Sequence, residues 1–254
     1  MNALVIAHNT YRETIRDRVL LGIVVAGLVL LALVQVARPL AMGEGLRLSV
    51  DLGLTSITLL GMLVVLLVGA GLVAKEIERR TIYNLLSRPL PRWTYVVGKW
   101  AGLSATLCVV AGAVGMALWV IVALQGHPGY ALALAEAVYL EVLELALVTA
   151  CAVLFSALST PVLSALYTGG LFLAGQWCDD LRRFATHAPG ALRTLLEVAA
   201  NVLPNLSLFN MRTLAAGGEA TSLLHLGLAT AYALAYCGGA LALAAAALES
   251  RDFR

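Results

Sequence analysis

The residues of this 254-residue chain that could do chemistry are few and far apart. A serine nucleophile needs a histidine within hydrogen-bonding distance, but Ser104 lies near one end of its apolar run and His225 near the opposite end of another. The Gly98-Lys99 pair lacks the earlier Gly and the following Ser or Thr of a phosphate-binding loop. The histidines and cysteines are dispersed, without H-E-x-x-H or C-x-x-C spacing. We therefore predict no catalytic residue, no metal site and no cofactor bound by this chain.

Two carboxylates stand inside an apolar run, which is an expensive position for charge. Glu141 and Glu144 are three residues apart and therefore share one side of a helix, with Glu136 ahead of them. Charged side chains within a bilayer frequently mark a substrate or proton route. Counted from Ser159 at 1.5 Å per residue, Glu144 lies about 22 Å along the helix, close to the outer interface. We hypothesise that the pair lines a transport path; a solvated or paired position at the outer rim is the alternative.

The elements that would position these residues are membrane helices. The chain is 61% hydrophobic with a mean hydropathy of +0.89, which is too apolar for a soluble domain. Its continuous apolar runs lack the alternation of a β-barrel, and a helix needs about 20 residues to cross the hydrocarbon layer. We predict an all-α integral membrane protein with a single transmembrane domain over 1–254. The six expected transmembrane helices are 19–37, 57–74, 101–124, 137–158, 162–177 and 223–248.

Basic residues near the ends of these runs orient the chain, because positively charged loops are retained in the cytoplasm. Eleven of the 17 Lys and Arg residues fall on one face of the six-span plan and six fall on the other. The richer face carries both termini and residues 75–99. We therefore expect both termini to be cytoplasmic.

Two flanking segments have amphipathic helical spacing. Residues 1–18 place Leu4, Tyr11 and Ile15 on one side, which favours a helix in the membrane interface over an extension of the first span into water. Residues 178–222 form the largest outer segment, and their spacing predicts a helical outer loop between the last two spans. It would lie on the outer surface or dip partway into the membrane.

Residues 75–92 gather charge between two of the most apolar runs. Stepping about 100° per residue places Ile82, Leu85 and Leu86 on one side of a helix and Glu76 and Arg80 on the other. Two prolines directly after residue 88 stop the helix. The sequence thus predicts a short cytoplasmic helix between spans two and three. The alternative is a basic loop that only enforces topology and contacts lipid headgroups.

The residue order of this stretch resembles permease subunits of type-2 ABC transporters, a group that includes permeases linked with multicopper enzyme maturation. Their motif reads roughly E-x-E-x-x-T-[IL]-x-x-L-L-[ST]-x-P-[IVL]-[SP]-R, followed by Gly-Lys. It is matched here by Glu76, Glu78, Thr81, Ile82, Leu85, Leu86, Ser87, Pro89, Leu90, Arg92, Gly98 and Lys99. The segments 1–18 and 203–210 are also similar to the family. Arg80 departs from it, because many members carry Gly there.

The resemblance implies that 76–88 is a coupling helix that docks on a separate ATPase subunit, while this chain itself is not an enzyme. The expected contact residues are Glu76, Glu78, Arg79, Arg80, Ile82, Tyr83, Leu85 and Leu86. Two ATPase copies would hold ATP and Mg, and a second permease, identical or related, would complete a dimer in membrane lipid, with no nucleic acid. The expected function is ATP-driven translocation of an unidentified substrate across a bacterial inner membrane, with export favoured. A membrane scaffold or secondary transporter without an ATPase is the alternative.

Overall fold

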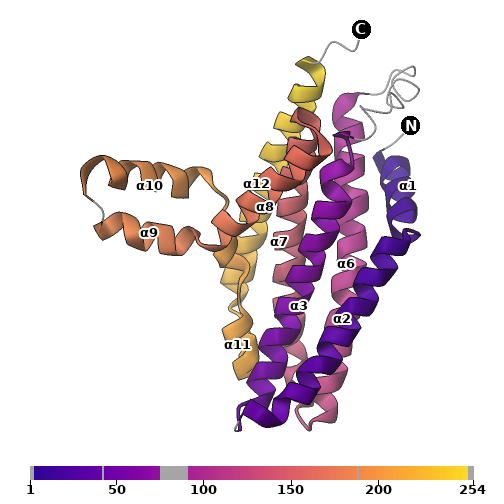
Figure 1. Ribbon diagram of the computed structural model, residues 1–254, viewed down its shortest axis with the longest axis vertical. Coiled ribbons are helices and arrows are strands. Elements are labelled where there is room, and N and C mark those ends of the chain that lie inside the picture. The colour runs from indigo at the N-terminus through magenta and orange to yellow at the C-terminus, as the bar shows by residue number, and fades with distance from the viewer. Residues whose placement is uncertain (1–2, 42, 75–90, 188, 251–254) are drawn as a thin grey trace.

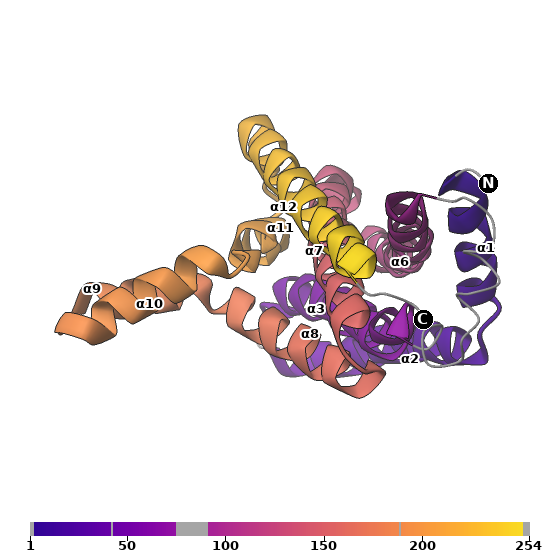
Figure 2. The same cartoon turned by 90° about the horizontal axis from the view of Figure 1, so that it is seen from above.

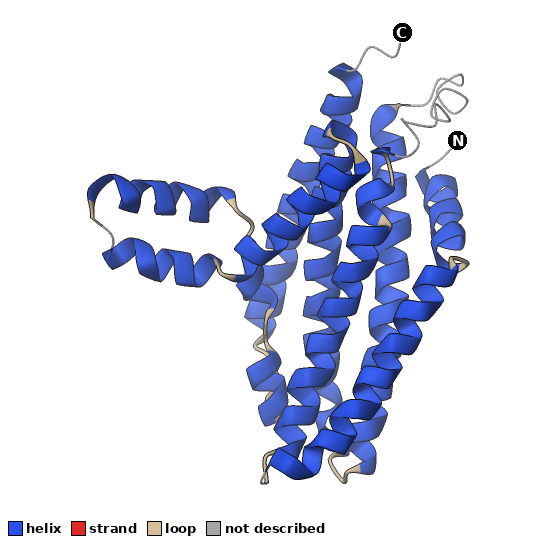
Figure 3. Cartoon of the chain, viewed as in Figure 1, coloured by secondary structure: helices blue, strands red, loops and turns tan. Residues whose placement is uncertain are grey.

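The computed structural model describes residues 3–41, 43–74, 91–187 and 189–250, and every regular element in these ranges is helical (Figures 1 and 3). The all-α prediction is confirmed for this part of the chain. In order, the elements are α1 (Ala3–Ile15), α2 (Arg18–Ala37), η1 (Arg38–Ala41), α3 (Gly45–Leu67), η2 (Gly69–Gly71), α6 (Arg92–Leu124), η3 (Pro128–Tyr130), α7 (Ala131–Leu158), α8 (Pro161–Gln176), α9 (Cys178–His187), α10 (Gly190–Val202), η4 (Leu206–Phe209), α11 (Arg212–Gly217) and α12 (Leu223–Ser250).

Five of the described helical segments are long and apolar enough to cross a membrane. They are Arg18–Val36, Gly45–Gly71, Arg92–Leu124, Pro128–Leu158 and Leu223–Glu249. The remaining expected span is helical as α8, but its 16 residues reach only about 24 Å at 1.5 Å per residue, less than the hydrocarbon thickness of about 30 Å. The protein is thus a multi-pass membrane protein, and the six-span plan stays a prediction.

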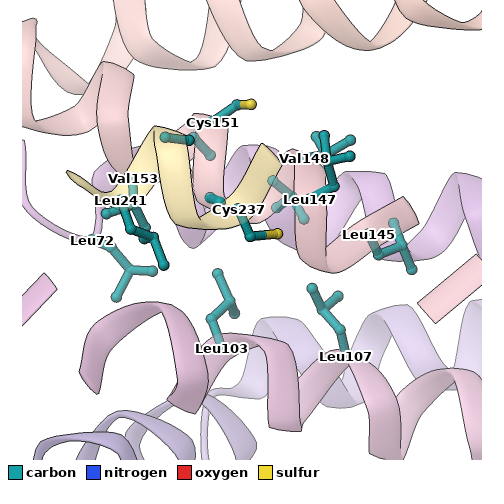
Figure 4. Close-up of a cluster of buried hydrophobic side chains, with 14 of the residues drawn as sticks. Leu72, Leu103, Leu107, Leu145, Leu147, Val148, Cys151, Val153, Cys237 and Leu241 are labelled. Carbon is teal, nitrogen blue, oxygen red and sulfur yellow. The ribbon is translucent and has the colours of Figure 1, made fainter. Parts of the chain in front are cut away.

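Helix α7 lies at the centre of the bundle, packed against α3, α6, α8 and α12. Leucines of α6 meet the leucine and valine side chains of α7 in the largest buried apolar cluster, which Figure 4 shows together with Leu241 of α12. Gly61 of α3 lies against Leu145 so closely that a Cβ there would be 2.3 Å from Leu145 Cδ1. Small residues let membrane helices approach in this way, because lipid provides no hydrophobic drive for their association.

Helix α1 packs against α6 at two glycines of α6, Gly98 and Gly102. A Cβ on Gly102 would lie 2.6 Å from the backbone oxygen of Ala7, so a larger residue would displace the helix. Ile6 and two threonines of α1 are buried, whereas Leu4, on the predicted apolar side, is 80% exposed. Seen from above, α1 lies along the flank of the bundle (Figure 2). The predicted apolar side is thus exposed at Leu4 but partly buried at Tyr11 and Ile15, and the position of α1 in the membrane interface stays a prediction.

The segment that leads from η2 toward residue 75 is fastened to α7 by one hydroxyl group. Ser156 Oγ accepts hydrogen bonds from the backbone N–H groups of Val73, at 3.1 Å, and Ala74, at 2.9 Å. Both N–H groups are buried in the bundle, so they need this acceptor. Ser156 therefore fixes the chain just before the stretch where the coupling helix is predicted.

The predicted outer segment, 178–222, is largely helical. Helices α9 and α10 pack against each other and project together from the side of the bundle, whereas α11 lies against α3 and α7 (Figures 1 and 2). Arg193 and Glu197 form an exposed pair on α10, with Nε and Oε1 2.8 Å apart. The pair of helices is therefore set apart from the core, while the segment that follows it returns to the bundle.

Candidate functional site

The two predicted carboxylates of α7 lie buried inside the bundle. Glu141 is 3% exposed and Glu144 is 1% exposed, and their spacing places them on one face of the helix. Glu144 stands about halfway along the 28 residues of α7. Because a buried charge is costly without a partner, the contacts of these two side chains define the site.

Arg212, the first residue of α11, supplies the positive charge. Its Nε lies 3.3 Å from Oε1 of Glu141, and its two terminal nitrogens donate to the hydroxyl groups of Thr55, at 3.2 Å, and Thr58, at 2.7 Å. The two threonines are three residues apart and therefore lie on one face of α3. One guanidinium group thus ties together α3, α7 and α11.

The second carboxylate has an amide partner. Gln176, the last residue of α8, donates from Nε2 to Oε1 of Glu144 at 2.6 Å. Glu141 Oε2 is buried with no hydrogen-bond partner among the described residues. The cluster therefore holds two carboxylates against the single guanidinium of Arg212, and it retains an unused acceptor in the protein interior.

Arg212 is positioned by the segment that precedes α11. Asp179 accepts hydrogen bonds from Asn205 Nδ2, at 3.0 Å, and from Ser207 Oγ, at 2.8 Å, so this carboxylate holds the segment that precedes α11. The hydroxyl of Tyr232, on α12, accepts from the backbone N–H of Asn205 at 2.9 Å. These hydrogen bonds fix segment 203–210, which resembles the family, and the fixed segment positions Arg212 against α7.

A groove of about 480 Å³ opens beside this cluster, between α3 and α8. Arg212, Gln176, Thr55 and Thr58 provide its polar lining, and the remaining lining residues are apolar. These are Leu59, Met62, Leu63, Leu66 and Phe172. The groove can therefore receive a molecule that is mostly apolar and has one hydrogen-bonding end.

The predicted partner-binding residues cannot be placed, because Glu76, Glu78, Arg79, Arg80, Ile82, Tyr83, Leu85 and Leu86 lie outside the described residues. The rejected Ser–His pair is not formed: His225 Nε2 lies 2.9 Å from the Leu208 carbonyl oxygen, and Ser104 Oγ has no described partner. Within the described ranges, no group of three or more His, Cys, Asp or Glu residues could hold a metal.

No disulfide bond joins any of the four cysteines, all of which lie in the described ranges. Burial raises the pKa of the Cys178 thiol, at the start of α9. The thiolate is the reactive form of cysteine, so a raised pKa disfavours reaction at this thiol.

Sequence reasoning predicted the carboxylates but missed their partners. Arg212 was counted only as one of the basic residues of the outer face, and Gln176, Thr55 and Thr58 had no assigned role. A usable signal existed, because carboxylates buried in a membrane helix require a donor, and Arg212 follows directly after the family-like stretch 203–210. Which of the 17 basic residues takes that place depends on the packing of helices that are distant in the sequence.

A membrane-embedded helical bundle with an internal charged cluster beside a groove has the character of a membrane transport component. The family model described as ABC-2 family transporter protein matches residues 4–246, nearly the whole chain. The chain belongs to this family and is a permease subunit of an ABC transporter. A search of curated proteins found no match to it.

Proposed function

We propose that this permease translocates an unidentified substrate, in the export direction, with energy from ATP hydrolysed on a separate ATPase subunit. The observation that carries the proposal is the family match over residues 4–246. A permease without chemistry of its own needs a rigid contact through which another subunit can shift its conformation. Residues 76–88, with their motif and amphipathic spacing, are the proposed contact.

In this proposal Ile82, Tyr83, Leu85 and Leu86 dock in the ATPase, and the charged residues Glu76, Glu78, Arg79 and Arg80 make polar contacts around them. Two ATPase copies carry ATP and Mg. A second permease, either another copy or a related chain, completes the transporter. The assembly lies in the bacterial inner membrane with both termini in the cytoplasm. The basic residues of segment 75–99 favour a cytoplasmic position for that segment as well.

We further propose that Glu141 and Glu144 border the transport path. The support is their burial at mid-helix, the unused Glu141 oxygen and the adjoining groove lined by Arg212 and Gln176. A shift of α3 or α8 would change the hydrogen bonds of Thr55, Thr58 and Gln176, so the cluster responds to movement of the helices around it.

The docking proposal is tested by placing a charge on the apolar side of the 76–88 helix. Tyr83→Asp and Leu86→Asp should each abolish co-purification with the ATPase and the ATP hydrolysis that depends on transport, because a carboxylate cannot enter an apolar groove unpaired. The matched controls Tyr83→Phe and Leu86→Met keep the apolar contact and should retain both. Unchanged association of the Asp variants would reject the assignment and favour a membrane scaffold or a secondary transporter. A neighbouring reading frame with a Walker A motif would support the ATPase-coupled function.

A further inference from the structure

A second cavity, of about 620 Å³, lies at the end of the bundle where α2 leads into α3 and α6 leads into α7. These connections are at the lower end of the bundle in Figures 1 and 3. The described lining residues are Gln35, Arg38, Pro39, Gly43, Gly45, Leu46 and His127. Arg38 is the only Lys or Arg among these described residues, and no carboxylate is among them. Its chemistry therefore differs from that of the cluster around Glu141.

The side chains that line this cavity offer hydrogen-bond donors. The Oε1 of Gln35 accepts from Gln125 Nε2 at 2.8 Å, and both Gln35 Nε2 and Gln125 Oε1 are buried without a partner among the described residues. Glu44, the nearest carboxylate along the chain, lies 3.6 Å from Arg47, and both side chains are mostly exposed. Arg38 is therefore not neutralised by that carboxylate.

Two glycines where α2 leads into α3 let the side chain of Arg38 take its position. A Cβ on Gly45 would lie 2.5 Å from Arg38 Cγ and 3.1 Å from its Nε, so only glycine lets the arginine rest over the first turn of α3. Gly43, which precedes α3, has a φ of 101°, a conformation that other residues rarely adopt. Substitution at either glycine would therefore move the guanidinium group.

The depth of this cavity in the membrane indicates its ligand. The 20 residues of helix α2, apolar between Arg18 and Gln35, span about 30 Å, the thickness of the hydrocarbon layer. Arg38 follows it directly and so stands where lipid phosphates lie. Its planar guanidinium binds a phosphate through two parallel hydrogen bonds, and Gln35 and His127 add further hydrogen-bonding groups.

We propose that this cavity binds the phosphate headgroup of a phospholipid in the leaflet at this end of the bundle. Arg38 provides the charge-assisted hydrogen bonds, and the Gln35 amide donates a further one. The ring of His127 lines the site and packs edge-on against Tyr130, with the two ring centroids 5.7 Å apart. The site is separate from the groove beside Arg212, and it does not depend on ATP coupling.

The test uses the whole chain purified in detergent, with thermal unfolding measured against added lipid. Phosphatidylglycerol should raise the Tm, and Arg38→Gln should weaken its apparent Kd by about tenfold or more, the loss expected for a charge-assisted hydrogen bond. Arg47→Gln is the matched control, because this arginine lies at the same end of the bundle but does not line the cavity. It should bind like the unchanged protein.

Three results would overturn the proposal. Equal stabilisation by diacylglycerol with the same acyl chains would show that the phosphate is not recognised. Equal stabilisation by inorganic phosphate would assign the cavity to a free anion. Equal weakening by Arg38→Gln and Arg47→Gln would place the effect in general surface charge. If Arg38→Gln does not fold, His127→Phe decides, because it keeps the aromatic contact with Tyr130, removes the ring nitrogens and should still weaken lipid binding several-fold.

Discussion

Glu141→Gln tests the buried ion pair most sharply, because it removes a charge and keeps the shape of the side chain. Arg212 would then remain largely buried, since its side chain is 19% exposed, and would lose its ion pair with Glu141 while Glu144 stays in the cluster. Removing one member of a buried pair costs about 3–5 kcal/mol. Thr55 and Thr58 would still accept hydrogen bonds from Arg212, so we expect the lower end, about 3 kcal/mol. At about 2–4 °C per kcal/mol for a chain of this size, the Tm should fall by about 6–12 °C.

The assay is thermal unfolding of the chain in detergent, followed by tryptophan fluorescence. Glu197→Gln is the matched control, because it removes the same group from the exposed pair with Arg193 and should leave the Tm unchanged. The double variant Glu141→Leu with Arg212→Met should recover only part of the loss, because Glu144 then stays buried, at 1% exposure, without a cation beside it. A fall of less than about 2 °C for Glu141→Gln, which corresponds to at most about 1 kcal/mol, would refute the reasoning that this pair is buried and coupled.

Three further changes test the packing. Ser156→Ala leaves two buried backbone N–H groups without an acceptor and should lower the free energy of unfolding by about 1–3 kcal/mol, measured by denaturation in mixed micelles. Gly102→Leu should displace α1 and expose it to protease, whereas Gly22→Leu, whose Cβ would meet nothing within 4 Å, should not; equal cleavage of the two would contradict the close contact. Asp179→Ala removes the acceptor of two side chains and should speed amide hydrogen exchange across 204–209. Unchanged protection there would show that Asp179 does not hold segment 203–210 in place.

The fold class follows from hydropathy, but the ends of the spans do not. The second span was expected to begin at residue 57, yet α3 begins at Gly45. The polar residues Arg47, Asp51 and Thr55 interrupt the apolar run in the sequence, but their spacing gathers them on one side of the helix. The opposite side remains buried, as Ser49, with no exposure, and Leu60, at 3% exposure, show, so the helix continues through the polar stretch.

The site could be predicted only in part for a related reason. Glu141 and Glu144 are close in the sequence, and the helical repeat alone places them together. Their partners come from α3, α8 and α11, and no local pattern specifies how those helices pack against α7. The partner-binding residues of 76–88 were inferred from the order of residues in a motif, and they lie outside the described residues, so their role stays a prediction.

The central claim is that a cytoplasmic helix at 76–88 transmits force from an ATPase to this bundle. It is tested most directly with Tyr83→Cys in intact cells, treated first with a maleimide that does not cross membranes and then, after lysis, with a cross-linker that joins a thiol to a lysine amine, with the parent chain and its four cysteines as the control. The account predicts that the thiol is protected from outside and forms an adduct whose mass equals this chain plus a protein with a Walker A motif. Labelling of residue 83 from outside, or an adduct without any nucleotide-binding partner, would contradict it.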